Sequence, residues 1–326
     1  MSYIISGYGR TCDTSVALFD DSRRMLWSDS IESPGFVCGS GNYFFAVTET
    51  KTHAALHAYR KNGDGYTRTD KIPIEGGLLC HISFSEKTNL LFGACYWTGN
   101  IFLVPFNNGE FGKARYIWQK RDAQLTRAHC VLPRQDVTDG DVELLTTNIA
   151  LDMLYIYRVR DGHMEQKQAI QLKRGIGPRH IIFSPDHSRL YLVTEYSNEV
   201  LVFDTSDYTL IQQISTLPTG FAGLSNCSTL CFSADGRYLY TANRFHDTIT
   251  VFSVEENGCL VYRDEFPCHG RNPRHMTVHE DTLAVCYLDS DAVSFVKLNP
   301  ETGMEEEETG RIHFGTPAGI FYLDER

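Results

Sequence analysis

Short apolar runs separated by polar turns recur along this chain. Four stretches show the pattern well: CHISFSEKTNLLFGACYWTGNIFLV, RHIIFSPDHSRLYLVTEYSNEVLVF, STLCFSADGRYLYTANRFHDTITVF and RHMTVHEDTLAVCYLDSDAVSFV. Each contains an apolar strand, a turn, a second apolar strand, a polar turn and a third strand. Val, Ile, Tyr, Phe and Thr dominate the runs, as is typical of strands. Helical periodicity over a dozen residues is absent, so the pattern predicts an all-β protein.

The spacing of these units predicts how many there are. The apolar residues that close the third strand of each unit recur 40 to 53 residues apart, at Phe19, Tyr59, Val104, Tyr157, Phe203, Phe252 and Val296. A period near 45 residues with several strands in each unit is typical of a β-propeller blade. Seven anchors therefore predict a seven-bladed β-propeller with four-stranded antiparallel blades, formed as a single domain over residues 1–326.

The two ends of the chain predict how the ring closes. The C-terminal segment GTPAGIFYLD supplies a first strand with no blade after it. The N-terminal segments SYIISGYG and TSVALFD supply strands with no first strand before them. We expect these strands to share one blade, because that pairing removes exposed sheet edges.

Polar side chains occupy two positions of the repeat. We place His81, His129, His180 and His275 at one register just before the first strand, with Thr229 at that register in the remaining copy. Tyr96, Glu195 and Arg244 fall at a second register just after the second strand. Because these two strands are antiparallel neighbours, the start of one lies beside the end of the other. Both sets are therefore expected on one face of the molecule.

Composition narrows the class of partner. The chain has 326 residues, 42% of them hydrophobic, and a net charge of −11. The negative charge and the lack of a Lys/Arg stripe argue against a nucleic-acid partner. No apolar run reaches the roughly 20 residues of a membrane span, and the N-terminus MSYIISGYGR lacks a secretory pattern. We expect a cytoplasmic monomer or homodimer, with its ten scattered cysteines as free thiols.

The sequence lacks the familiar motifs of metal-binding and nucleotide-binding sites. The remaining histidines show no metal-ligand spacing. No G-x-S-x-G, Walker loop or dinucleotide fingerprint is present. The sequence therefore predicts neither a metal nor a cofactor.

Longer motifs resemble a known family. The stretches GPRHIIFSPDHSRLYLVTEYSNEVLVFD, FSADGRYLYTANRFHDTITVF and GRNPRHMTVHEDTLAVCYLDSDAVSFVKLNPETG are similar to the seven-bladed propeller lactonases. That family includes propeller-type 6-phosphogluconolactonases and fungal carboxy-muconate cycloisomerases. The resemblance implies a small-molecule anionic lactone or carboxylate as substrate. It also implies a catalytic set of His129, Arg179, Glu195 and Arg244, taken from the motifs RAHCVLP, GPRH, VTEY and ANRFHD.

The chain departs from the family at two places. It reads LSNCSTL at residues 224–230, where phosphogluconolactonases of the family usually read E-N-T-A-A-E-I. It has Asn148 where they usually have Asp. Both departures bear on the choice of substrate rather than on the fold.

The implied residues suit lactone hydrolysis. Water must be activated near the ester carbonyl, and positive charge must lie where the oxyanion develops. His129 is expected as the general base, with Glu195 orienting it or acting as its acid–base partner. Arg179 and Arg244 are expected to clamp an anion and stabilise the developing charge. The same set would suit a cycloisomerase, in which a base removes a proton next to a carboxylate.

Other residues are candidates for substrate binding, and each has a plainer interpretation. The candidates are His81, Asn148, His180, Arg274 and Tyr96. A histidine at the start of an inner strand often makes a hydrogen bond within its blade, and we favour this role for His180 and His275. Tyr96 also suits a core position, and Arg179 with Glu195 suits a simple inter-strand salt bridge. A propeller that only scaffolds protein partners is the alternative from a different functional class.

Overall fold

The computed structural model describes residues 2–9, 14–119, 125–134 and 141–323, and every regular element in these ranges is a β-strand. None of the described segments is a helix long and apolar enough to cross a membrane. The chain divides into two compact units, the first made of Met1–Arg174 with Phe321–Arg326 and the second of Gly175–Ile320. The prediction of a single domain stays a prediction.

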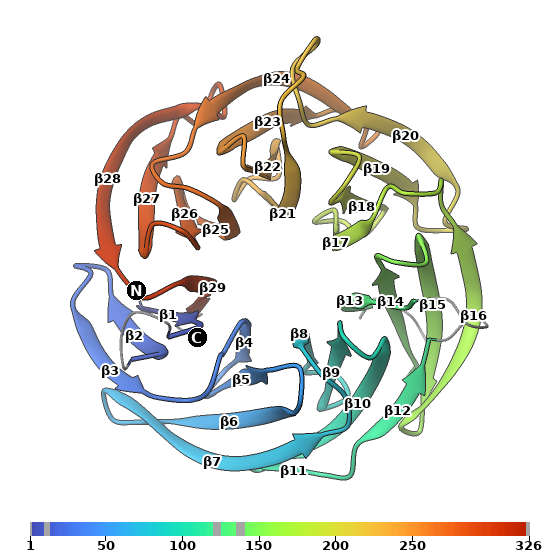
Figure 1. Ribbon diagram of the computed structural model, residues 1–326, viewed down its shortest axis with the longest axis vertical. Coiled ribbons are helices and arrows are strands. Elements are labelled where there is room, and N and C mark those ends of the chain that lie inside the picture. The colour runs from blue at the N-terminus through green and yellow to red at the C-terminus, as the bar shows by residue number, and fades with distance from the viewer. Residues whose placement is uncertain (1, 10–13, 120–124, 135–140, 324–326) are drawn as a thin grey trace. The chain divides into compact units, whose positions relative to one another are not determined.

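Seven antiparallel sheets form within the described ranges, and we call each one a blade (Figure 1). The strands of the first unit are β1 (Ser2–Gly7), β2 (Val16–Asp20), β3 (Met25–Asp29), β4 (Val37–Ser40), β5 (Tyr43–Glu49), β6 (Ala54–Asn62), β7 (Gly65–Ile74), β8 (Leu79–Ser85), β9 (Leu90–Cys95), β10 (Asn100–Asn107), β11 (Glu110–Phe111), β12 (Arg115–Trp118), β13 (Ala128–Arg134), β14 (Val142–Asn148), β15 (Met153–Arg160) and β16 (His163–Gln171). The later strands are β17 (Pro178–Phe183), β18 (Arg189–Thr194), β19 (Glu199–Asp204), β20 (Leu210–Ser215), β21 (Asn226–Phe232), β22 (Tyr238–Arg244), β23 (Thr248–Val254), β24 (Leu260–Pro267), β25 (Pro273–His279), β26 (Thr282–Tyr287), β27 (Ala292–Leu298), β28 (Glu305–His313) and β29 (Pro317–Leu323).

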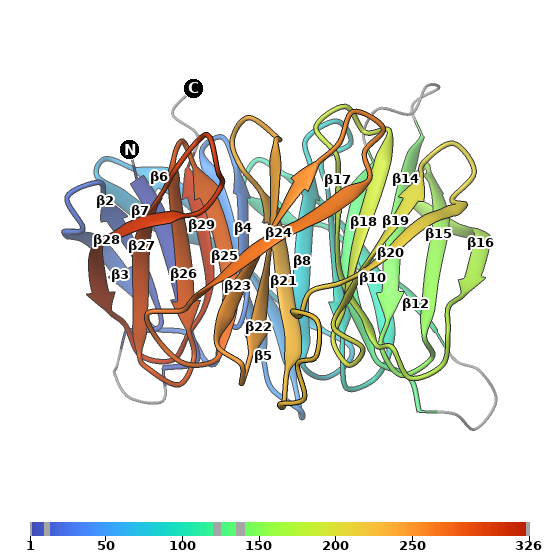
Figure 2. The same ribbon diagram turned by 90° about the horizontal axis from the view of Figure 1, so that it is seen from above.

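Each blade is a run of neighbouring strands joined in chain order. The outermost strand of the β8 blade is split into β11 and β12, which both pair with β10. One blade has the order β29-β1-β2-β3, so the C-terminal strand lies beside the N-terminal strand as predicted. In the β21 blade the outer strand β24 runs obliquely to β21, the usual twist of a β-sheet (Figure 2).

The cores of both units lie between the faces of successive blades. In the first unit the Phe44 ring stacks on Tyr59 at 4.4 Å, and the Trp27 ring meets Phe44 edge-on at 5.9 Å. In the second unit a buried cluster joins β22 residues such as Tyr240 to β26 residues such as Val285. Because neighbouring blades cover both faces of these strands, successive residues are buried, which explains the near-continuous apolar runs in the sequence.

A β-bulge recurs at one register of the first strand in five blades. It lies between Leu79 and His81, Ala128 and Val131, Pro178 and Ile181, Cys227 and Leu230, and Pro273 and His275. A bulge sets two residues opposite one partner residue and redirects their side chains. The first of the two bulge positions holds Cys80, His129, Arg179, Ser228 and Arg274. The second holds His81, Cys130, His180, Thr229 and His275.

The bulge corrects the predicted histidine register. His129 occupies the first bulge position, whereas His81, His180 and His275 occupy the second. All four lie inside their strands rather than before them. The error arose because the two bulge positions are neighbours in the sequence. Spacing alone does not tell which of the two a histidine occupies.

Candidate functional site

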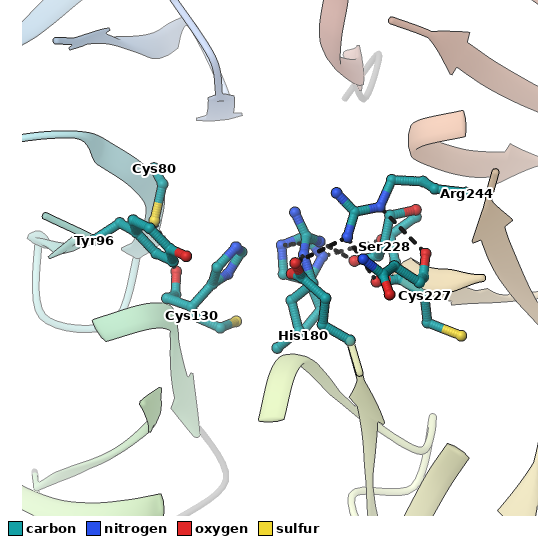
Figure 3. Close-up of polar contacts among 12 residues, drawn as sticks. Cys80, Tyr96, Cys130, His180, Cys227, Ser228 and Arg244 are labelled. Atoms are coloured by element: carbon teal, nitrogen blue, oxygen red, sulfur yellow. Dashed lines mark hydrogen bonds and ion pairs between the residues drawn. The ribbon is translucent and has the colours of Figure 1, made fainter. Parts of the chain in front are cut away.

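An ion cluster in the second unit joins Arg179, Glu195 and Arg244 (Figure 3). Glu195 Oε2 accepts a hydrogen bond from Arg179 Nε at 3.0 Å. Its other oxygen, Oε1, lies 3.1 Å from Arg244 Nη2. The Glu195 carboxylate therefore bridges two guanidinium groups that come from different blades. The structure brings together three of the four residues that the family resemblance implies.

Local structure explains how each member reaches the cluster. Arg179 stands at the first bulge position of β17, so its side chain is redirected toward the next blade, where Nη1 donates to the Ser228 carbonyl. Glu195 directly follows β18, and Arg244 is the last residue of β22. The Arg244 side chain is fixed by donating from Nε to the Asn226 carbonyl at 3.2 Å.

The members of the cluster differ in exposure. The Arg179 side chain is only 1% exposed, whereas those of Arg244 and Glu195 are 11% and 15% exposed. Arg179 is thus a buried cation whose Nε contacts Glu195. Arg244 Nη2 donates to the Cys227 carbonyl and contacts Glu195, while Nη1 makes no hydrogen bond within the described residues. A ligand that reaches the cluster would meet Arg244 and Glu195 first.

The electrostatics of the cluster favour an anionic ligand. Burial raises the pKa of Glu195, but the positive charges of Arg179, Arg244 and Arg274 outweigh it and hold that pKa below its usual value. Glu195 is therefore ionised at neutral pH. Burial lowers the pKa of Arg244, and Arg274 lowers it further, against the opposing effect of Glu195. Three guanidinium groups around one carboxylate leave an excess of positive charge.

A nearby thiol is not a nucleophile. Cys227 lies beside the cluster, with its carbonyl accepting from Arg244 and its Sγ 3.1 Å from Asn243 Oδ1 (Figure 3). Burial raises the pKa of Cys227 to about 12. Because the thiolate is the reactive form, this thiol is inert at neutral pH.

The histidines at the second bulge position of this unit link neighbouring blades. His180 Nδ1 lies 3.1 Å from Thr229 Oγ1 of the next blade. His275 Nδ1 accepts from the Ile320 amide of β29 at 3.4 Å. His180 also has a contact within its own blade, because its Nε2 lies 3.3 Å from Arg179 Nη1. Burial, with the positive charges of Arg179 and Arg274, lowers the pKa of His275 to about 4, so this imidazole is neutral at pH 7.

In the first unit, Tyr96 and His129 lie together with an arginine that the sequence analysis did not single out. Arg127 Nη1 donates to the Tyr96 hydroxyl at 2.8 Å, and its guanidinium carbon lies 4.8 Å from the Tyr96 ring centre. The Tyr96 and His129 rings meet edge-on at 6.0 Å. Arg127 stands two residues before His129 in the motif R-A-H, which is the signal that could have identified it.

His81 also contacts the following blade of the first unit. Its Nδ1 accepts from the Val131 amide at 3.4 Å, and its Nε2 lies 3.5 Å from Cys130 Sγ. Cys80, at the first bulge position and labelled in Figure 3, directs its thiol to the His129 carbonyl at 3.3 Å. His81 therefore links two blades as His180 and His275 do, and its contact with substrate stays a prediction.

Protein groups of the first unit surround the Asn148 side chain, and its contact with substrate stays a prediction. Its Oδ1 accepts from the amides of Arg127 and Leu151, and its Nδ2 donates to Gln119 Oε1 and Thr126 Oγ1. An asparagine side chain has two acceptor sites and two donor hydrogens, so this set satisfies it completely. Asn148 is fully buried and fastens the segment before β13.

No group of three or more His, Cys, Asp or Glu side chains within the described residues is arranged to hold a metal ion. The ion cluster of the second unit offers arginine guanidinium groups and one carboxylate.

Comparisons with known proteins agree with this fold. A family described as "Lactonase, 7-bladed beta-propeller" matches residues 23–321. A 6-phosphogluconolactonase of Bacillus subtilis is 25% identical over 299 residues, which cover 86% of this chain and 82% of the relative. The solved structure of the Pseudomonas aeruginosa periplasmic gluconolactonase PpgL has a TM-score of 0.89 at 20% identity and covers 99% of both chains. A putative 6-phosphogluconolactonase of Bacteroides fragilis has a TM-score of 0.87 at 21% identity, over 99% of this chain and 98% of its own. The predicted seven-bladed propeller is confirmed.

Proposed function

Because the chain belongs to the seven-bladed β-propeller lactonase family, we propose that it hydrolyses a sugar lactone such as 6-phosphogluconolactone at the cluster of Arg179, Glu195 and Arg244. The observation that carries the proposal is Arg244, whose Nη1 makes no hydrogen bond within the described residues while Glu195 and two backbone carbonyls fix the rest of the guanidinium. An ester oxyanion is stabilised by a preorganised N–H donor in a site from which water is partly excluded.

In the proposed reaction, water adds to the lactone carbonyl and the negative charge that develops on oxygen is held by Arg244. The ring C–O bond then breaks, and the leaving alcohol oxygen takes up a proton to give the open-chain acid. The lowered pKa of Glu195 makes it a weak base, so we do not give it the role of general base. Instead, Glu195 holds Arg244 in place and balances the charge of Arg179. Arg179 is a positioning residue in this scheme, since its buried guanidinium acts through Glu195.

His129 remains our candidate for the general base. That assignment rests on its motif, R-A-H-C, and on the resemblance to the family. A pH–rate profile tests it directly. If His129 is the general base, the limb of the profile that reports loss of a proton from the base should be missing in His129→Gln.

The excess positive charge of the cluster also supports an anionic substrate. A phosphate or carboxylate on the sugar would be attracted to Arg244 and Arg274, and arginine binds both groups with paired N–H donors. We propose 6-phosphogluconolactone ahead of the uncharged lactone for this reason. A cytoplasmic location fits a phosphorylated substrate and is part of the proposal.

The test is a pH-stat hydrolysis assay with 6-phosphogluconolactone and gluconolactone, each corrected for its spontaneous rate. We expect wild-type turnover on at least one lactone, and a fall in kcat/KM of about a hundredfold or more in Arg244→Gln, the scale seen when one oxyanion donor is removed. Arg237→Gln is the matched control, because Arg237 is an exposed arginine of the same blade that pairs with Asp235. Equal turnover in Arg244→Gln and Arg237→Gln would refute the assignment. Proton exchange next to a carboxylate without hydrolysis would show a cycloisomerase instead.

A further inference from the structure

Exposed aromatic side chains follow the polar residues of the second register. Tyr196 comes directly after Glu195 and is 46% exposed, and Phe245 comes directly after Arg244 and is 50% exposed. In the first unit Trp97 follows Tyr96 at the same register and is 46% exposed. Large aromatic side chains usually bury most of their surface, so repeated exposure at one position of the blade calls for a ligand.

The Tyr196 ring is held in a fixed place. Gly177 precedes Pro178 and Arg179, and its backbone has a φ of +66°. A Cβ at Gly177 would lie 2.6 Å from Cδ2 of Tyr196, so the ring rests directly on this glycine. One face of Tyr196 therefore packs against the segment that leads into Arg179, and nearly half of its surface is open to solvent.

Phe245 adopts a backbone conformation that phenylalanine disfavours. Its φ is +71°, in the left-handed region. The residues at the same register in two other blades, Trp97 and Tyr196, donate their amides to the carbonyls of Gly77 and Ile176 and keep a negative φ. The Phe245 side chain therefore leaves its turn in a different direction from the Tyr196 side chain. Left-handed strain in a bulky residue that stays half exposed points to a functional role.

These two residues adjoin the proposed site. The side chains of Glu195 and Arg244 meet at 3.1 Å, and Tyr196 and Phe245 are the residues that directly follow them in the chain. The arginines supply the charge that an anion needs, but they offer nothing to the carbon skeleton of a sugar. Binding sites commonly combine a few polar groups with aromatic walls.

We propose that Tyr196 and Phe245 form an aromatic wall that binds the C–H face of a ring lactone while its oxygens are held by Arg244. This inference rests on the proposed function and deepens it: the preferred substrates would be six-membered ring lactones that present an apolar ring face. The aromatic wall determines which lactones bind, whereas the cluster of Arg179, Glu195 and Arg244 catalyses hydrolysis.

The experiment compares wild type, Phe245→Gly, Tyr196→Ala and Tyr196→Phe, with Val261→Ala on the outer strand β24 as an exposed apolar control. Steady-state kinetics are measured with δ-gluconolactone, and inhibition by inorganic phosphate is measured in parallel. An aromatic contact typically contributes about threefold to tenfold in affinity. We expect KM to rise by that factor in Phe245→Gly and in Tyr196→Ala with kcat nearly unchanged. Tyr196→Phe and Val261→Ala should match wild type, as should phosphate inhibition of all variants.

Stability gives a second readout for Phe245. Glycine adopts a φ of +71° without strain, so Phe245→Gly should keep or raise the melting temperature while it weakens lactone binding. A fall in stability with unchanged KM would show a packing role and overturn the wall.

Failure of the wall and failure of the proposed function are distinguishable. If wild type hydrolyses no lactone, the proposed function fails. The wall is then tested by calorimetry with gluconate, for which the same variants should lose affinity. If wild type is active and neither Phe245→Gly nor Tyr196→Ala changes KM, the wall is refuted and the lactonase activity stands.

Discussion

Replacing Glu195 by glutamine tests whether the ion cluster is one electrostatic unit. The substitution keeps the shape of the side chain and removes the charge that bridges Arg179 and Arg244 at 3.0 and 3.1 Å. Removing one partner of a buried ion pair typically costs about 3–5 kcal/mol, because the other charge is left uncompensated. Arg179 is almost fully buried, whereas Glu195 and Arg244 retain some solvent contact that screens the loss. We expect Glu195→Gln to lower the free energy of unfolding by about 3 kcal/mol.

Urea unfolding is the assay, and an exposed ion pair provides the control. Asp235→Asn removes the partner of Arg237, a pair whose side chains are about half exposed, so its cost should stay below about 1 kcal/mol. A double-mutant cycle with Arg179→Met then isolates the pairwise term. We expect the double variant to recover most of the loss, because it leaves no unpaired buried guanidinium at position 179. Equal costs for Glu195→Gln and Asp235→Asn, or additive effects in the cycle, would contradict the reasoning.

The same variant should respond differently to acid. Because the folded-state pKa of Glu195 is lowered, its contribution to stability is present at neutral pH and is lost as the pH falls through that folded-state pKa. Wild type should therefore lose stability below about pH 4.5, and Glu195→Gln should lack this part of the loss. Although Glu195→Gln should be less stable than wild type, it should bind inorganic phosphate more tightly. Without the carboxylate, the guanidinium groups of the cluster attract an anion more strongly.

Three further substitutions test separate parts of the structure. His275→Asn should flatten the loss of stability between pH 6.5 and 4: the pKa of this buried imidazole is lowered to about 4, so the unfolded chain takes up the proton first and the fold loses about 3 kcal/mol over this range. Urea unfolding at several pH values measures the difference. Gly177→Ala should destabilise the protein by about 1–2 kcal/mol and raise the KM for gluconolactone, because the new Cβ displaces the Tyr196 ring; unchanged kinetics would count against the fixed position of Tyr196. Asn148→Ala should cost about 3 kcal/mol, because it leaves four hydrogen-bonding groups unsatisfied in a buried place, whereas the exposed Asn42→Ala should cost less than about 1 kcal/mol; thermal unfolding distinguishes them.

The sequence predicted the fold because the signal for it is repeated. A single apolar run is ambiguous, but seven anchors at a nearly constant spacing leave few alternatives to a propeller. The pairing of β29 with the N-terminal strands was also predictable, because a C-terminal first strand and N-terminal strands without one complete each other.

The errors at the candidate site have local physical causes. The shift between His129 and the other histidines is a single residue, and only the bulge geometry reveals it. The hydrogen bonds of Asn148 were not predictable, because a sequence does not show that all four hydrogen-bonding positions of an amide are used inside the protein. Phe245 escaped attention because neither its φ of +71° nor its exposure has a sequence signature. These are properties of tertiary contacts and backbone angles, on which residue spacing is silent.

The recurring bulge explains why the dipeptide Arg-His occurs twice in the second unit. Two consecutive residues of an ordinary strand point to opposite faces, whereas the two residues of a bulge share one partner residue and point in a similar direction. At Arg179-His180 the second residue links its blade to the next through Thr229. The first residue places its guanidinium against Glu195. His275 makes the corresponding blade link to β29, and its neighbour Arg274 adds positive charge beside Glu195. The blade links thus hold the same backbone that positions the arginines, so a substitution that loosens a link should also lower the affinity of the cluster for anions.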